Sequence, residues 1–238
     1  MRFGVRAHDI PASDPLELCQ KLQTLGIREI QLVAHKSFPG FCYDEQNIRD
    51  LAAVFAAHNI QVMIYGCYID PLTVQGQERF LEHIRYATIL GADAIATESA
   101  VGLTQLQEDE EVYQQLVPAF RRFAEETKKV GVRAAIETVY AHPICSPEKT
   151  LRLLEDVGSD NLYVILDPVN LAHYENDPRV QDYTREAIHA YGERILVIHW
   201  KERILDRTHP AVRFAKNSED TILITEGLMP EEIQKIKI

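Results

Sequence analysis

Eight short apolar runs, spaced along the whole chain, constrain the fold more than any other feature of this sequence. They are rich in Val and Ile and cover residues 2–7, 29–34, 60–66, 93–98, 132–138, 162–167, 195–200 and 221–226. Most are apolar at successive positions, which indicates strands buried on both faces, as in a parallel sheet that lies under helices. The sequence therefore predicts eight buried parallel strands.

Segments with the helical spacing of apolar residues separate these runs. They cover residues 14–27, 44–60, 76–92, 110–132, 146–159 and 179–194, with shorter candidates at 210–217 and 230–238. Asp14 is a candidate N-cap, Pro15 fits the first turn and Gly26 a stop, whereas Pro118 is expected to kink its helix. Such alternation predicts helical crossovers between parallel strands.

Eight strand–helix units in 238 residues favour an α/β fold, a closed (β/α)8 TIM barrel, which typically needs about 250 residues. An open doubly wound sheet is the alternative. Its first turn is normally rich in glycine, and residues 6–15 contain none. Because no low-complexity segment or Gly/Ser linker divides the chain, we predict one barrel domain over residues 1–238.

Charge and cysteine content narrow the class of protein. The formal net charge of -11 argues against nucleic acid and anionic membranes as partners, because an acidic surface repels phosphate groups. No apolar run could span a bilayer, and Asp9 and Pro11 come too early for a signal peptide. The four cysteines are scattered without a CxxC pair, which disfavours a zinc knuckle or a disulfide framework. We expect a cytoplasmic protein that acts on small molecules.

The ends of the last four predicted strands carry side chains that can bind a metal. These strands end at Glu137, Asp167, His199 and Glu226, and barrel enzymes place their active sites at this end of the strands. A lone carboxylate there is commonly a cap or turn residue. Several carboxylates around one mouth repel one another, and a divalent cation relieves that repulsion. The sequence therefore predicts one divalent metal ion, and the ligand set suits Mn²⁺, Mg²⁺, Co²⁺ or Zn²⁺.

At these residues the sequence resembles a known family. The segments AIETVYAHP, VILDPVNL, VIHWKE and ILITEG, together with YGCYIDP at 65–71, resemble the sugar phosphate isomerase/epimerase family of xylose isomerase-like barrels. The resemblance implies that Glu137, Asp167, His199 and Glu226 hold the metal. It also implies that Glu137 and Glu226 serve as acid/base groups. The expected reaction is isomerisation or epimerisation of a sugar or sugar phosphate by proton transfer through an enediolate.

Further polar residues lie at or just past the strand ends and are candidates for substrate contact: His8, Glu98, His142, Asn170, His173 and Lys201. Asn170 departs from the resemblance, because epimerases of known ketose specificity tend to carry a histidine three residues after the strand-six aspartate. The segment between His199 and Glu226 is also short and lacks the usual Gly-Glu-Gly. Barrels of this kind are often dimers or tetramers, so a homo-oligomer is a possible assembly.

Other functions on the same scaffold stay open. A dehydratase or a hydroxypyruvate-isomerase-like enzyme would use the same ligands, since a fold does not fix a reaction. An abasic-site endonuclease is disfavoured by the acidic charge and by Asn170, which stands where that chemistry needs a histidine. A non-catalytic binding barrel that retains the ligands is the remaining alternative.

Overall fold

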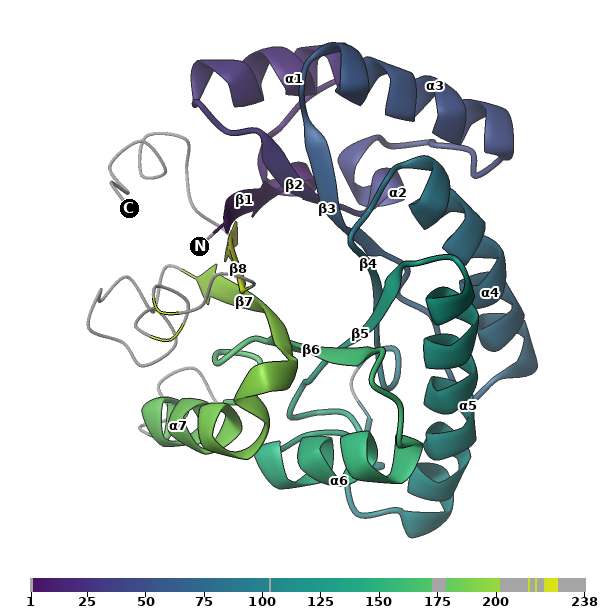
Figure 1. Cartoon of the computed structure of the whole chain (residues 1–238), viewed down its shortest axis with the longest axis vertical. Coiled ribbons are helices and arrows are strands. Elements are labelled where there is room, and N and C mark those ends of the chain that lie inside the picture. The colour runs from purple at the N-terminus through teal and green to yellow at the C-terminus, as the bar shows by residue number, and fades with distance from the viewer. Residues whose placement is uncertain are drawn as a thin grey trace.

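The computed structural model describes residues 2–102, 104–172, 179–201, 214, 217 and 221–226, and the side chains of Lys201 and Glu226 lie outside the described part. Within these residues, eight parallel strands form a closed barrel in sequence order (Figure 1). They are β1 (Arg2–Arg6), β2 (Glu29–Leu32), β3 (Gln61–Gly66), β4 (Ala94–Glu98), β5 (Arg133–Glu137), β6 (Leu162–Leu166), β7 (Ile195–Lys201) and β8 (Ile222–Glu226).

The pairing of the first and last strands closes the ring. β1 pairs in parallel with β2 on one side and with β8 on the other, with Arg2 opposite Ile222 and Val5 opposite Thr225. This pairing confirms the predicted barrel and rules out the open doubly wound sheet, whose edge strands have no partner. It also shows that the run 221–226 supplies the last strand.

Helices surround the ring of strands on its outside (Figure 1). After β1 to β6, in order, come α1 (Pro15–Thr24), α3 (Glu45–Ala57), α4 (Val74–Ile89), α5 (Glu110–Lys129), α6 (Pro147–Val157) and α7 (Val180–Tyr191). None of the described helices combines the length and the apolar character that a membrane crossing requires. The predicted helix at 230–238, and that at 210–217 apart from Phe214 and Asn217, lie outside the described residues. A single domain over residues 1–238 therefore stays a prediction.

Local signals set the helix ends. The Asp14 carboxylate accepts the backbone N–H of Glu17, Pro15 is the first residue of α1, and the helix ends before Gly26, whose φ is 71°. α4 begins two residues earlier than predicted because the Thr73 hydroxyl caps it by accepting from the backbone N–H of Gly76 at 3.0 Å. Pro118 lies inside α5, which runs through it without a break.

The predicted end of the second strand was wrong by two residues. We predicted a strand over 29–34, but β2 ends at Leu32, and Ala34 begins the short helix α2 (Ala34–Ser37). The Val33 carbonyl accepts the backbone N–H groups of Lys36 and Ser37 and the hydroxyl of Ser37, which turns the chain at once. Periodicity could not reveal this turn, because a single turn of helix is too short to show a period.

The alternation along the strands decides which residues face the barrel interior. Ala96, Ala135, Ile165 and Val197 belong to one buried cluster inside the ring. Successive side chains of a strand point to opposite faces, so the residue two positions further faces the same interior. In β4, β5 and β7, and just after β6, these next inward residues are Glu98, Glu137, His199 and Asp167.

A substitution at Gly4 in β1 tests how closely β1 and β2 approach each other. A Cβ at this position would lie 2.7 Å from the backbone oxygen of Glu29 in β2. We expect Gly4→Ala to destabilise the fold by about 1–3 kcal/mol, because a backbone atom cannot move aside. The control is Gly192→Ala, where the nearest atom is a side-chain carbon of Phe214 at 3.4 Å. Urea unfolding measures both, and equal midpoints would contradict the expectation.

Candidate metal centre

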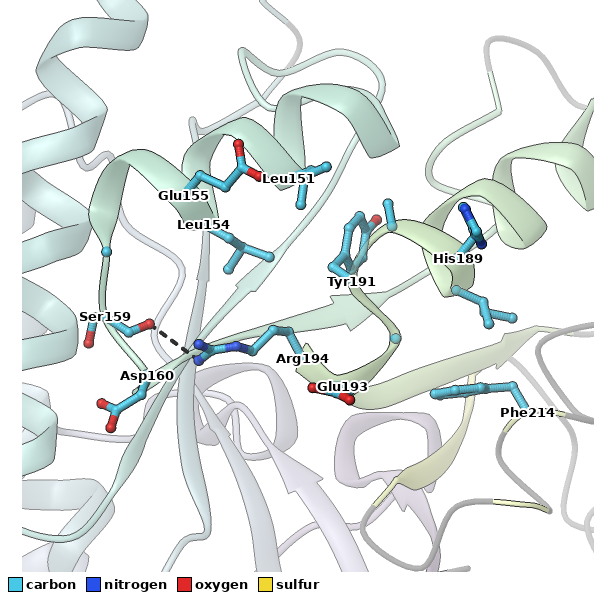
Figure 2. Close-up of a pocket in the computed structure, with 14 residues that line it drawn as sticks. Leu151, Leu154, Glu155, Ser159, Asp160, His189, Tyr191, Glu193, Arg194 and Phe214 are labelled. Atoms are coloured by element: carbon cyan, nitrogen blue, oxygen red, sulfur yellow. Dashed lines mark hydrogen bonds between the residues drawn. The ribbon is translucent and has the colours of Figure 1, made fainter.

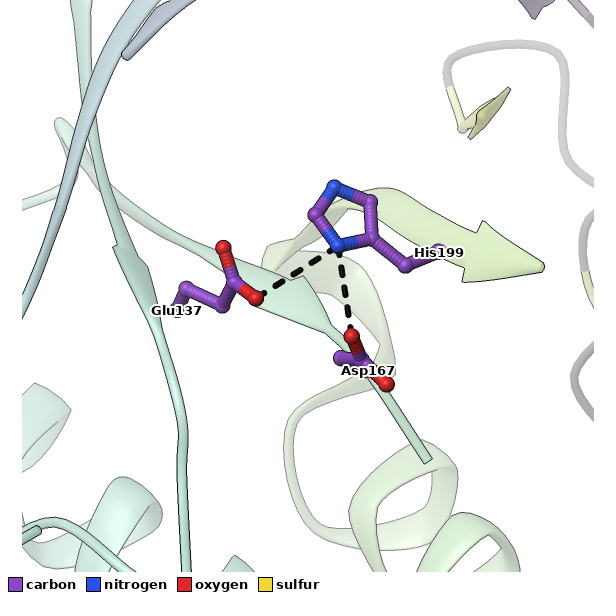
Figure 3. Close-up of side chains that lie close together, drawn as sticks. All are labelled: Glu137, Asp167 and His199. Carbon is purple, nitrogen blue, oxygen red and sulfur yellow. Dashed lines mark ion pairs between the residues drawn. The ribbon is translucent and has the colours of Figure 1, made fainter. Parts of the chain in front are cut away.

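Three of the four predicted ligands meet at the carboxyl end of the barrel. Glu137 ends β5, Asp167 directly follows β6 and His199 lies in β7. One ligand atom from each lies within 4.8 Å of the others. In Figure 3 the Glu137 and Asp167 carboxylates point toward the same nitrogen of His199. The predicted strand ends therefore bring these side chains together.

All three side chains are withdrawn from solvent. Asp167 is 0% exposed, His199 1% and Glu137 4%. Two carboxylates buried side by side cost free energy unless a cation or hydrogen-bond donors compensate their charge. His199 Nδ1 lies 3.5 Å from Glu137 Oε1 and 3.4 Å from Asp167 Oδ2, longer than a normal N–H···O hydrogen bond.

A hydrogen bond on its far side sets the tautomer of His199. Its Nε2 lies 2.7 Å from Oε1 of Gln31, an amide oxygen that only accepts. Nε2 therefore carries the proton, and in the neutral ring the lone pair of Nδ1 faces the two carboxylates. Three electron-rich atoms around one point match the donor set of a divalent cation, so these residues fit the predicted metal.

Gln31 and Tyr68 extend this arrangement into a chain of hydrogen bonds. Gln31 Nε2 donates to the Tyr68 hydroxyl at 3.0 Å, and that hydroxyl donates to Glu137 Oε2 at 2.9 Å. Every donor faces an acceptor, and the chain joins two candidate ligands through β2 and the segment after β3. Sequence reasoning missed this role of both residues. Its signal was Gln31 itself, an isolated polar residue in an apolar strand, which must find a partner when buried.

Asn170 supports two candidate ligands. Its side-chain Nδ2 donates to Glu137 Oε1 at 2.8 Å, and its backbone N–H donates to Asp167 Oδ1 at 3.0 Å. Asp167 Oδ1 also accepts the backbone N–H of Val169 at 3.0 Å. The residue that departs from the epimerase pattern thus holds the ligands in place, and a contact between Asn170 and substrate stays a prediction.

Neighbouring carboxyl groups at this end differ in their tendency to ionise. Glu98 is paired with Glu137 in the register of β4 and β5. Burial, followed by the charge of Glu137, raises the pKa of Glu98 to about 8. Burial also acts to raise the pKa of Glu137. In the metal-free protein the positive charge of a protonated His199, its hydrogen bond and the hydrogen bond from Tyr68 outweigh burial, so this pKa lies below its ordinary value. Without metal, a protonated carboxyl and a carboxylate therefore stand side by side near neutral pH.

Two predicted substrate-contact histidines lie close to these groups. His142 Nε2 donates to the backbone oxygen of Gly102 at 2.7 Å, while its Nδ1 lies 3.7 Å from Glu98 Oε2. His8 lies in the 3-10 turn η1 (Ala7–Asp9) after β1. Burial and then the charge of Arg6 lower the pKa of His8 to about 4, so this ring is neutral at pH 7.

The remaining predicted site residues are only partly placed. Glu226 is the last residue of β8, opposite Lys201 of β7 in the register. Its backbone therefore ends at the same mouth as the other three candidate ligands, while both side chains and the whole of His173 lie outside the described residues. Metal binding and acid/base roles for Glu226, and substrate contacts for Lys201 and His173, stay predictions.

A cavity of about 760 Å³ lies elsewhere, between α6, α7 and the turn η2 (Gly192–Arg194). Figure 2 shows Leu154 and Tyr191 on its walls and Arg194 donating to the backbone oxygen of Ser159, at 3.2 Å. Glu137, Asp167 and His199, the candidate ligands whose side chains are described, do not line it. It belongs to the helical layer, and the candidate metal centre is separate from it.

Gln31→Met tests the hydrogen bond that orients His199. The substitution leaves the Nε2 proton without its acceptor, so we expect the affinity for Mn²⁺ or Zn²⁺ to fall about 10- to 100-fold. The control is Gln46→Met on the exposed surface of α3. Isothermal titration calorimetry measures both, and an unchanged affinity in Gln31→Met would contradict the role.

The raised pKa of Glu98 predicts that the stability of the metal-free protein depends on pH. A folded-state pKa of about 8, above the ordinary value of 4.5, means that the folded state favours the protonated carboxyl. Its contribution to stability is therefore complete below about pH 4.5 and is lost as the pH rises toward 8. In EDTA, we expect the Tm of the wild type to fall relative to that of Glu98→Gln between pH 5 and 8. Parallel Tm curves would show the expectation to be wrong.

Solved structures share this fold at low sequence identity. The 3-keto-D-glucoside 4-epimerase from E. coli superposes with a TM-score of 0.79 at 12% identity, over 99% of this chain and 97% of that one. The IolI protein with a bound zinc atom gives 0.76 at 16% identity, over 99% and 94%. An L-ribulose 3-epimerase gives 0.75 at 19% identity, over 100% and 87%. No curated protein sequence matches the chain.

The sequence itself matches a family model. Residues 19–227, which include β2 to β8 and the three converging side chains, match the model of the xylose isomerase-like TIM barrel. The closed ring of eight parallel strands agrees with that match. This chain therefore belongs to the xylose isomerase-like TIM barrel family.

Proposed function

We propose that this protein is a divalent-metal-dependent isomerase or epimerase of sugars or sugar phosphates. The observation that carries the proposal is the convergence of Glu137, Asp167 and His199 Nδ1, with the histidine proton turned away toward Gln31. Epimerases of 3-keto-D-glucosides and of L-ribulose have the same fold, and IolI carries zinc. These likenesses support sugar chemistry as the class of reaction.

The bound metal would act as a Lewis acid toward a carbonyl and its neighbouring hydroxyl, which makes the adjacent C–H more acidic. Glu137, Asp167 and His199 would hold it, with Glu226 as the proposed fourth ligand. Tyr68 and Asn170 each donate a hydrogen bond to Glu137 and fix its carboxylate in one orientation. A fixed carboxylate loses little freedom when it accepts a proton from substrate carbon.

Glu137 and Glu226 would then share the proton transfer. As a metal ligand Glu137 would be ionised, and so it suits the role of base. Glu226, at the end of β8, would return a proton to the opposite face in an epimerisation or to the next carbon in an isomerisation. Glu98, which ends β4 beside Glu137 in the register, would contact a substrate hydroxyl.

Metal analysis followed by hydrogen exchange tests the function. We expect the purified protein to contain about one divalent ion per chain and to move solvent deuterium onto carbon in at least one member of a panel of ketoses and ketose phosphates. A dehydratase would instead release water with net loss of substrate. Absence of exchange across the panel, with metal bound, would contradict an isomerase.

Glu137→Gln tests the residue that we assign both as ligand and as base. The amide keeps the shape but cannot take a proton, so we expect exchange to fall at least about 10²-fold and metal content to fall with it. The matched control is Glu186→Gln on the exposed face of α7. Full activity with metal retained in Glu137→Gln would remove the assignment.

A further inference from the structure

A lysine that the sequence analysis did not single out lies near the candidate metal centre. Lys36 is an exposed residue of α2, the short helix that directly follows β2. Its ammonium Nζ lies 5.1 Å from the centroid of the Tyr68 ring. The hydroxyl of the same tyrosine donates to Glu137 Oε2. One tyrosyl ring therefore separates this cation from the carboxylate that we assign as base.

The turn that carries Lys36 is held from several sides. The Val33 carbonyl accepts the Lys36 backbone N–H at 3.0 Å. The Tyr43 hydroxyl accepts the His35 backbone N–H at 3.0 Å and contacts His35 Nδ1 at 2.9 Å. Phe38, which follows the turn, is buried. The backbone of Lys36 is thus fixed at the mouth, and only its flexible side chain adjusts.

The charge of Lys36 is not neutralised by the described residues. It forms no ion pair with them, whereas the nearby Arg6 is held by both oxygens of Asp9, at 2.9 and 2.8 Å. The effect of the ammonium extends into the site. The pKa of His8 is lowered by burial, by the charge of Arg6 and then by the charge of Lys36. Burial and Glu137 raise the pKa of Glu98, and the charge of Lys36 opposes that rise.

We propose that Lys36 binds an anionic group of the substrate, so that the preferred substrate is a sugar derivative with a phosphate or carboxylate remote from its reacting carbons. The inference rests on the proposed function for the position of those carbons. A lysine ammonium is a point charge that pairs with phosphate or carboxylate oxygens in any orientation. Tyr68 sets the distance between the anionic group and the reacting carbons, because its ring contacts the Lys36 ammonium and its hydroxyl contacts Glu137, the proposed base.

The alternative is that Lys36 only offsets the negative charge of Glu98 and its neighbours. In that case its removal would act on the acidic groups themselves, and neutral and anionic ligands would be affected alike. An anion-binding lysine instead changes one class of ligand and leaves the other unchanged. The two explanations therefore differ in selectivity rather than in total activity.

The test uses the Mn²⁺-loaded protein with Lys36→Met, which removes the charge at similar length, and Lys36→Arg, which keeps it. Calorimetry measures the Kd for inorganic phosphate, and exchange kinetics measure KM for D-ribulose 5-phosphate, a keto-uronate and D-ribulose. We expect Lys36→Met to raise the phosphate Kd and the KM of one anionic substrate about tenfold or more, without change for D-ribulose. Lys36→Arg should retain most binding. A raised KM for D-ribulose 5-phosphate identifies phosphate as the group that Lys36 binds, and a raised KM for the keto-uronate identifies carboxylate.

Lys129→Met, at the last residue of α5, is the control for loss of a surface charge. Equal losses for neutral and anionic ligands, or none for either, would overturn the proposal. A fall in Mn²⁺ affinity with unchanged phosphate binding would do the same. If phosphate binding depends on Lys36 but no compound exchanges deuterium, the anion site stands and the proposed isomerase function fails.

Discussion

The structure depends on one arrangement of charge: two buried carboxylates and the Nδ1 of one histidine face the same point. Glu137 and Asp167 are withdrawn from water, and the only proton of a neutral His199 lies on Nε2, bound to Gln31. Such an arrangement is costly unless a cation occupies the centre. Gln31, Tyr68 and Asn170 then have a physical role, because their hydrogen bonds keep the three ligand atoms pointed inward.

The barrel makes this concentration of charge possible. Inward residues lower in the strands, such as Ala135, Ile165 and Val197, fill the interior with apolar contacts. Two residues further along each strand the same face reaches the mouth, where polar side chains replace apolar ones. The apolar layers stabilise the strands that hold the candidate ligands at the mouth.

Much of this was accessible from the sequence, and the exceptions have clear causes. The alternation of strands and helices predicted the ring, and the strand ends predicted Glu137, Asp167 and His199 as neighbours. The contact of Asn170 with Glu137 could not be predicted, because it joins the turn after β6 to the end of β5, and their relative position depends on the packed strands. α2 was missed because a turn of four residues has no detectable period, and with it Lys36 was missed as a cation at the mouth.

The amino-acid sequence alone determined the period of the strands and the chemistry of the residue that ends each one, since both follow from local pattern. Only the tertiary structure decided which nitrogen of His199 faces the carboxylates, which residues orient them and how near Lys36 lies to Glu137. These properties depend on contacts between residues far apart in the chain. Gln31 and His199 meet only because the ring closes, and closure is a property of all eight strands together.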